Sequence, residues 1–152
     1  MKTDKVIRIP LKLMVFSKGT GYGIRALAYL ARQSEHRQCG VHEIAASERI
    51  PSEYLRKLLA ELRRHRLVRS VKGVHGGYLL ARSPREITLW DVFSVLDQDP
   101  YLDECVLCNS RDDDPSCPFC SEWKRIGEDL IVNLKGKTIE DFANYPAETA
   151  KR

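Results

Sequence analysis

The sequence predicts a mainly α-helical fold that carries one short β-hairpin. Apolar residues recur at helical spacing over most of the chain, and one glycine-rich turn separates two short segments in which apolar residues alternate. Apolar residues make up 43% of the chain and charged residues 30%, which is ordinary for a globular protein. The 152 residues are enough for one domain with a core, or for one small domain with an appendage.

The first residues favour neither a membrane anchor nor a secretory leader. Arg8, Pro10 and Lys12 interrupt the apolar positions near the N-terminus, and no apolar run in the chain is long enough to span a bilayer. We therefore expect a cytoplasmic protein with no membrane partner, in which residues 1–13 form an N-terminal extension. A helical pattern starts directly after Met14, so Met14 is an alternative start of translation.

Two helices are expected in the first fifty residues. Apolar residues at helical spacing predict one from about Ser17 to Gln33, and a short one around Ile44. A break at Pro51 ends the short helix and starts a third, with either Ser52 as its N-cap or Pro51 in its first turn.

The third helix is amphipathic and basic. Its apolar residues fall at i, i+3, i+4 and i+7 and predict one buried face: Leu55, Leu58, Leu59 and Leu62. Eight lysines and arginines lie between positions 49 and 72, against two glutamates. A helix, a tight turn and a basic helix are the helix-turn-helix pattern, and such a basic surface attracts a phosphate backbone.

A basic β-hairpin follows the third helix. Residues 68–71 alternate, residues 72–77 form a glycine-rich tip, and residues 78–81 continue the pattern. A helix-turn-helix followed directly by a basic hairpin is a winged helix, which we assign to residues 14–96. A further helix opens at Thr88, with Asp91 in position for a capping box. The expected partner is double-stranded DNA, and no small-molecule substrate is expected.

The residues expected to contact DNA lie on the third helix and at the hairpin tip. The first turns of such a helix approach base edges in the major groove, where Arg56 can donate two hydrogen bonds to a guanine. Cations further along the helix face phosphates, and Lys72 and His75 reach phosphate or the minor groove. Glycines allow close approach of the backbone. The full set is Ser52, Glu53, Arg56, Lys57, Arg63, Arg64, Lys72, His75, Gly76 and Gly77.

Four of the five cysteines form two C-x-x-C pairs within sixteen residues: Cys105, Cys108, Cys117 and Cys120. A C-x-x-C turn brings two sulfurs to one centre, and two such turns complete a four-sulfur shell. In a reducing compartment this clustering favours metal binding or redox chemistry over structural disulfides. We therefore interpret residues 97–117 as a cysteine-rich metal-binding loop. Its aspartates at 112–114 are expected to solvate the loop, and the helix start after Cys117 is expected to lower thiol pKa values.

Several stretches resemble the Rrf2 family of bacterial winged-helix transcription regulators. They are YGIRALAYLA, the run from EIAASERIP to LWDVF, CSEWKRIGEDL and LKGKTIEDF, and the most specific piece is YLRKLLAELRRHRLVRSVKGVHGGYLLAR. The resemblance covers roughly residues 14–143. Family wings usually read Arg-Gly-Pro-Gly-Gly-Gly-Tyr, whereas here Lys72, Val74 and His75 replace the first, third and fourth residues.

The resemblance implies a homodimer on a pseudo-palindromic operator. Its dimerisation helix corresponds to about residues 118–135, within a segment 118–143 that also holds a short last helix, and a tail follows at 144–152. The matching apolar stripe supplies the expected interface: Trp123, Ile126, Leu130, Ile131 and Leu134. Packing of this stripe inside its own domain is the alternative.

The resemblance also bears on the cysteine loop. It implies three cysteine ligands and a variable fourth, and Cys120 stands where one regulator of the family has a histidine. A partner-subunit acid used by another member corresponds to about Gly21, which has no ligand atom. The expectation is an all-cysteine site within one subunit. Three alternatives stay open: an iron–sulfur cluster whose state changes DNA affinity, a structural Zn ion, and a metal-free dithiol switch.

The sequence shows no pattern of an enzyme. It has no Ser/His/Asp order, phosphate loop or paired carboxylate of a catalytic site. A thiol oxidoreductase or an electron-transfer protein is the weaker alternative for the C-x-x-C pairs. The first should have a βαβ context around the motif, and the second has no need of a basic helix and wing. The isolated Cys39 is interpreted as a small buried hydrophobe.

Overall fold

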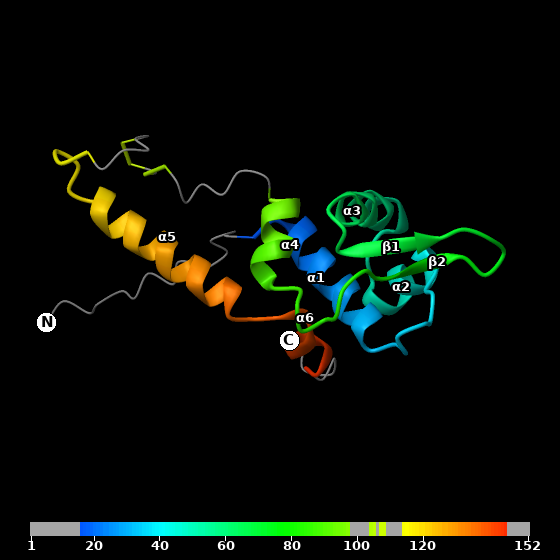
Figure 1. Cartoon of the computed structure of the whole chain (residues 1–152). Helices are drawn as coiled ribbons and strands as arrows, with labels where there is room; N and C mark the ends of the chain where they lie inside the picture. Colours follow the sequence, from blue (N-terminus) through cyan, green and yellow to red (C-terminus); the bar gives the residue numbers. More distant parts are fainter. Residues whose placement is uncertain (1–15, 98–103, 106, 109–113, 146–152) are drawn as a thin grey trace, which may run out of the picture.

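The computed structural model describes residues 16–97, 104–105, 107–108 and 114–145. Figure 1 shows a helical body with a hairpin at one end and a long helix extending from the other. In chain order the elements are α1 (Lys18–Ala31), α2 (Val41–Glu48), α3 (Ser52–Arg64), β1 (Val68–Val71), β2 (Gly77–Leu80), α4 (Leu89–Leu96), α5 (Cys120–Lys135) and α6 (Ile139–Ala143). The predicted mainly helical fold with a small hairpin is confirmed. The expected extension at 1–13 and most of the expected tail at 144–152 lie outside the described residues.

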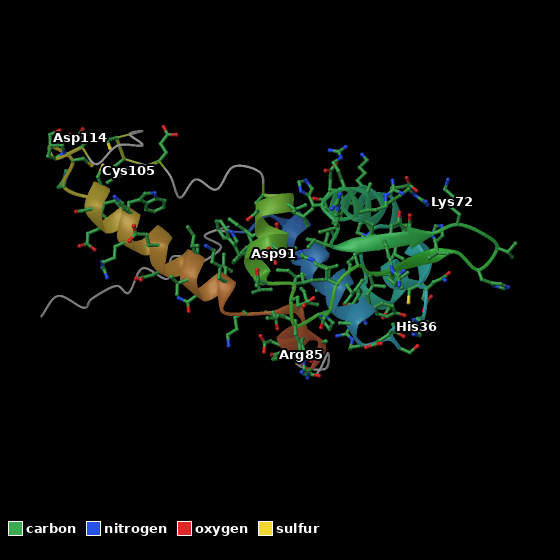
Figure 2. All side chains as sticks on the ribbon, in the orientation of Figure 1. His36, Lys72, Arg85, Asp91, Cys105 and Asp114 are labelled. Carbon is green, nitrogen blue, oxygen red and sulfur yellow. The ribbon has the colours of Figure 1, made fainter. Side chains whose placement is uncertain are left out.

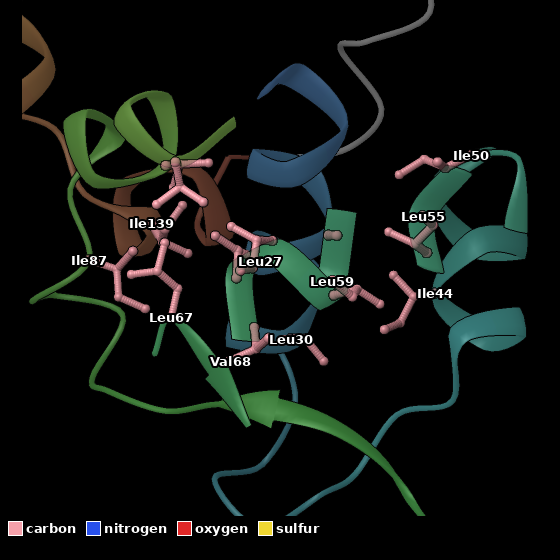
Figure 3. Close-up of a cluster of buried hydrophobic side chains, with 14 of the residues drawn as sticks. Leu27, Leu30, Ile44, Ile50, Leu55, Leu59, Leu67, Val68, Ile87 and Ile139 are labelled. Atoms are coloured by element: carbon pink, nitrogen blue, oxygen red, sulfur yellow. The ribbon is translucent and has the colours of Figure 1, made fainter. Parts of the chain in front are cut away.

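Branched apolar side chains from most of the helices meet in one core (Figure 3). The stripe predicted on α3 is buried, and three of its four leucines (Leu55, Leu59 and Leu62) share this core with Leu27 of α1 and Ile44 of α2. The short helix α6 contributes Ile139, which is as fully buried as Ile87 before α4. Each such side chain stabilises the fold by about 1.5–3 kcal/mol, so the last helix is part of the body.

The connection between α2 and α3 is tight. Arg49 ends α2 in the left-handed region with φ 52°, and the backbone N–H of Ile50 donates to the carbonyl of Ala45 at 2.9 Å. The helix α3 then begins at Ser52, with Pro51 in the N-cap position. The two predictions for this boundary are therefore wrong by one residue. The proline ring holds φ at −57° and has no N–H of its own, and no side chain caps the helix at this position.

The hairpin strands pair antiparallel, with Val68 opposite Leu80 and Val71 opposite Gly77. Cys39 extends this sheet by one bridge, because its N–H donates to the Tyr78 carbonyl at 2.9 Å and its carbonyl accepts from the Tyr78 N–H at 2.8 Å. Cys39 is fully buried, as predicted. The wing is thereby hydrogen bonded to the chain between α1 and α2.

The ends of α4 and α5 are joined at the body. Thr88 and Asp91 form the predicted capping box at the start of α4. The backbone N–H of Leu89 donates to the Lys137 carbonyl at 2.9 Å, and the N–H of Ile139 donates to the Ile87 carbonyl at 2.9 Å. The helix α5 begins two residues later than predicted and ends at residue 135, directly before the glycine that was predicted to stop it. Its far end projects away from the body (Figure 1).

Within the described residues, no helix combines the length and the apolar character that crossing a membrane requires.

Candidate metal centre and DNA-binding surface

The structure brings the four predicted cysteine ligands together. The sulfur atoms of Cys105, Cys108, Cys117 and Cys120 all lie within 4.8 Å of one another. Cys105 and Cys120 are buried, and the other two are half-buried. Figure 2 shows Cys105 beyond the free end of α5, far from the wing that carries Lys72. The cluster therefore stands at the start of α5, remote from the hairpin.

Backbone amides shape the first C-x-x-C turn. The N–H groups of Leu107 and Cys108 donate hydrogen bonds to the sulfur of Cys105, with the Leu107 bond the stronger influence, and lower the pKa of this thiol to about 7. Such bonds favour the thiolate, because they place partial positive charge on the sulfur. The thiolate is the form in which cysteine binds metals.

Asp114 shapes the second turn. Its carboxylate accepts from the Ser116 backbone N–H at 2.9 Å and from the Ser116 hydroxyl at 2.6 Å, and these bonds lower the pKa of Asp114. Its carbonyl accepts from the Cys117 N–H at 3.0 Å. Asp114 was predicted only to keep the loop solvated. In the structure it forms a turn that orients Cys117. The other two aspartates of the run, 112 and 113, lie outside the described residues.

Cys120 occupies the first position of α5. The lowered pKa expected at a helix start is wrong for this residue. Its thiol pKa is raised, first by a hydrogen bond with Cys108, then by burial, and then by the sulfurs of Cys117 and Cys105. A proton shared among crowded sulfurs is thus held on Cys120. A metal cation would supply the positive charge that this proton supplies in the metal-free site.

The distances between the sulfur atoms lie on either side of the distance expected around a single tetrahedral metal ion. The Cys105 and Cys117 sulfurs are 4.0 Å apart, and those of Cys108 and Cys120 are 3.1 Å apart. In a tetrahedral site with a metal–sulfur distance of about 2.3 Å, the sulfurs lie about 3.8 Å from one another. Four thiolates are also the donor set of two-iron and four-iron clusters. The four thiols therefore have the right donor atoms for either a single ion or an iron–sulfur cluster. The distances between their sulfur atoms are closer to those around a single ion.

The predicted DNA-contacting cations lie on one exposed face of α3. Arg56, Lys57, Arg63 and Arg64 are all exposed. Arg56 pairs with Glu53 one turn earlier at 3.7 Å, and Arg64 pairs with Glu61 at 3.2 Å. The Arg63 guanidinium donates to the Ser70 hydroxyl of β1 at 3.1 Å. Exposed pairs of this kind contribute little to stability. Replacing these partners by DNA phosphates therefore costs the protein little folding free energy.

The wing tip presents Lys72 and His75 to solvent. Val74 at this tip is 98% accessible and was not predicted as a site residue. Gly76 and Gly77 have structural reasons for lacking a side chain. An added Cβ would lie 2.4 Å from the Val71 carbonyl oxygen at the first, and 2.6 Å from the Cys39 carbonyl oxygen at the second.

The residues predicted as a dimer interface differ in burial along α5. Leu134 is buried in the core of its own subunit, and Leu130 packs against that core. Trp123 and Ile131 are half-buried, and Ile126 is 45% exposed. Val132, which the stripe did not include, is 69% exposed. Sequence periodicity found the apolar face of α5 but could not say that its last turn packs inside the body.

Comparison with known proteins identifies the family. The Rrf2 family model, described as "Iron-dependent Transcriptional regulator", matches residues 16–145. The chain belongs to the Rrf2 family. Family members and relatives of this Rrf2 chain are transcription regulators and not enzymes, which confirms the expected class.

Two curated relatives cover most of this Rrf2 protein. An HTH-type transcriptional regulator of Aquifex aeolicus is 36% identical over 135 residues, covering 86% of this chain and 92% of the relative. The HTH-type transcriptional regulator CymR of Bacillus subtilis is 31% identical over 133 residues, covering 88% and 91%. The chain is thus a DNA-binding transcription regulator of the winged-helix type.

Solved structures agree with the fold. CymR of B. subtilis, described as the global cysteine regulator, superimposes with a TM-score of 0.74 at 28% identity, over 86% of this chain and 97% of that chain. T. potens IscR superimposes with a TM-score of 0.69 at 28% identity, over 90% of each. The arrangement of body, hairpin and α5 is therefore shared with other Rrf2 proteins.

Proposed function

We propose that this Rrf2 protein binds a double-stranded operator as a homodimer, with an affinity that an iron–sulfur cluster on Cys105, Cys108, Cys117 and Cys120 controls. The observation that carries the proposal is the donor set: four thiols, which are the ligands of two-iron and four-iron clusters, come together at the start of α5. The donor set is complete within one subunit, so no residue of a second copy is needed. An iron–sulfur group supplies a centre whose oxidation, loss or reaction with nitric oxide changes its charge and its hold on the thiolates.

The DNA-binding half rests on charge and shape. The helix α3 has its leucines buried and its cations exposed, so the face toward solvent is the basic one. Its first two turns, from Ser52, carry Glu53 and Arg56 for base edges. Lys57, and the wing residue Lys72, extend the basic surface for phosphate contacts.

The dimer half rests on α5. The part of α5 that projects from the body keeps Ile126 45% exposed, and Val132, in the last turn beside the buried Leu134, is 69% exposed on another side of the helix. Exposed apolar side chains on such a helix gain stability by packing against a second copy. Two copies joined through α5 would present two α3 helices, as a palindromic operator requires.

The centre can influence DNA binding because of where its ligands lie in the chain. Cys105 and Cys108 follow α4, whereas Cys117 and Cys120 lead into α5. Four thiolates bound to one centre connect α4 and α5 at a second place, in addition to their contact at the body. Loss of that connection lets α5 change its angle and the spacing of the two recognition helices. A switch of this kind requires the two arrangements to differ in stability with the centre loaded and empty.

A single tetrahedral Zn ion is the second candidate for the same four ligands. The observation that favours it is the short spacing between sulfurs, because a cluster places an iron between each thiolate and the bridging atoms and so needs a wider shell. In this case the centre fixes the start of α5 structurally.

The test is to purify the protein without oxygen, record its visible spectrum, and measure iron, sulfide and zinc. We expect a brown protein with iron and sulfide, and a change of at least about 5-fold in operator affinity when the centre is removed. A colourless protein with stoichiometric zinc would establish the second candidate. Equal operator affinity with and without the centre would contradict the proposed control.

A further inference from the structure

Asp97 connects the end of α4 to the start of α1. It follows the last residue of α4, and seven residues separate it from Cys105. Its carboxylate accepts from the Thr20 hydroxyl at 2.7 Å and from the Ser17 backbone N–H at 3.2 Å. Thr20 is fully buried, and within the described core it is the buried polar side chain. A buried hydroxyl that loses its acceptor destabilises the fold, so this contact holds both helices.

The carboxylate also completes the start of α1. The Ser17 hydroxyl accepts from the Thr20 backbone N–H at 3.2 Å, and the first turn of α1 contains no acidic residue of its own. Negative charge is stabilising at the positive end of a helix. Asp97 provides that charge from 77 positions away in the sequence.

The end of α4 is also packed closely on α1. A Cβ added at Gly23 would lie 2.4 Å from a methyl carbon of Leu96, the neighbour of Asp97. Because there is no free space at this contact, a shift of the α4 end moves the first half of α1 with it.

The start of α1 in turn touches the first turn of α3. A Cβ at Gly19 would lie 2.8 Å from the hydroxyl oxygen of Tyr54, and the rings of Tyr22 and Tyr54 meet edge to face with centroids 5.9 Å apart. Tyr54 stands two residues after the start of α3, beside the positions assigned to base edges. A continuous set of contacts therefore runs from Asp97 to the DNA-reading turn.

We infer that Asp97 is a positioning residue that couples the four-cysteine centre to the recognition helix α3. The inference rests on the proposed function, because it adds, beside the change in the angle of α5, a path within one subunit by which the centre reaches the DNA surface. With the centre loaded, Asp97 keeps its bonds to Ser17 and Thr20. With the centre empty, those bonds are released, and the starts of α1 and α3 loosen together.

The main test measures operator affinity for the loaded and the metal-free protein, using a duplex selected from a random library with the loaded wild type. The ratio of the two affinities is the coupling, and we expect Asp97→Asn to reduce it by at least about 5-fold. Asp91→Asn is the matched control, since it removes a capping carboxylate from the other end of α4 and should leave the ratio unchanged. Thr20→Val should behave as Asp97→Asn does, and Thr20→Ser, which keeps the hydroxyl, should retain the wild-type ratio.

Hydrogen exchange separates this inference from the proposed function. Removing the metal from the wild type should increase amide exchange at residues 17–22 and 52–56, and in Asp97→Asn exchange there should already be high and respond little. A wild type whose operator affinity ignores the metal, but whose exchange at 17–22 responds, contradicts only the proposed function. A wild-type coupling ratio in Asp97→Asn, or no response of exchange in the wild type, overturns the inference.

Discussion

The sulfur atoms of Cys108 and Cys120 lie 3.1 Å apart, although each belongs to a different C-x-x-C turn. Cys105 and Cys117 meet in the same way at 4.0 Å, so each thiol of the first turn faces its counterpart twelve positions later in the second. A metal bound between them draws on both turns at once. The centre therefore connects the chain after α4 with the first residue of α5, and it cannot be assembled from either turn alone.

Cys120→Ala is expected to weaken metal binding by more than about 10-fold, since loss of even an outer partner of a ligand has effects of that size. Cys117→Ala should do the same, and in both variants operator affinity should no longer depend on the metal. The measurement is the absorption spectrum of the cobalt-substituted protein, together with a DNA-binding titration. Cys39→Ala is the control, because this thiol lies in the body against the wing and should leave metal content unchanged. A wild-type response to oxidant and nitric oxide in Cys120→Ala would contradict the sensor proposal.

The metal-free protein should form its first thiolate near pH 7. Hydrogen bonds from Leu107 and Cys108 lower the pKa of Cys105 to about 7, whereas that of Cys120 is raised by its bond with Cys108. A lowered thiol pKa stabilises the folded state above the unfolded pKa of about 8.5, and this contribution is lost as pH falls toward 7. The raised pKa of Cys120 acts in the opposite direction at alkaline pH. Thiolate absorbance measured against pH should show the early step in the wild type and lack it in Cys105→Ser.

Two arginines of α3 should differ in what they contribute to DNA binding. Arg56 lies in the second turn, with its pair Glu53 in the first, so Arg56→Ala should reduce discrimination at one base pair by about 1–3 kcal/mol. Arg64 is the last residue of the helix, so Arg64→Ala should weaken binding to all sequences and lower the salt slope by about 1. Binding of matched and mismatched duplexes at several salt concentrations distinguishes these effects. Equal losses on both duplexes for Arg56→Ala would remove its base-reading role.

Local patterns predicted much of the fold, and tertiary contacts explain what was missed. The leucine stripe of α3, the glycine hairpin and the Thr88 capping box each depend on residues close in sequence, and the structure contains them. The four cysteines could be assigned to one site because their spacing is itself a metal-ligand pattern. The bond between Asp97 and Thr20 joins residues 77 positions apart, so no local signal indicates it. The burial of Leu134 likewise depends on where α5 returns to the body.

Alanine substitutions at two glycines should change the free energy of unfolding in opposite directions, because one glycine is closely packed and the other is not. At Gly77 a Cβ would meet the carbonyl oxygen of Cys39 at 2.6 Å, whereas at Gly21 in α1 nothing lies within 4 Å. Gly77→Ala should lower the free energy of unfolding by about 1–3 kcal/mol, because the bridge between Cys39 and Tyr78 must open. Gly21→Ala should raise it by about 0.5–1 kcal/mol, because alanine loses less conformational freedom in a helix. Urea unfolding of both variants provides the comparison, and equal shifts in the same direction would show that the wing is not packed on residue 39. Because the same bridge holds the hairpin to the body, Gly77→Ala should also weaken DNA binding, whereas Gly21→Ala should not.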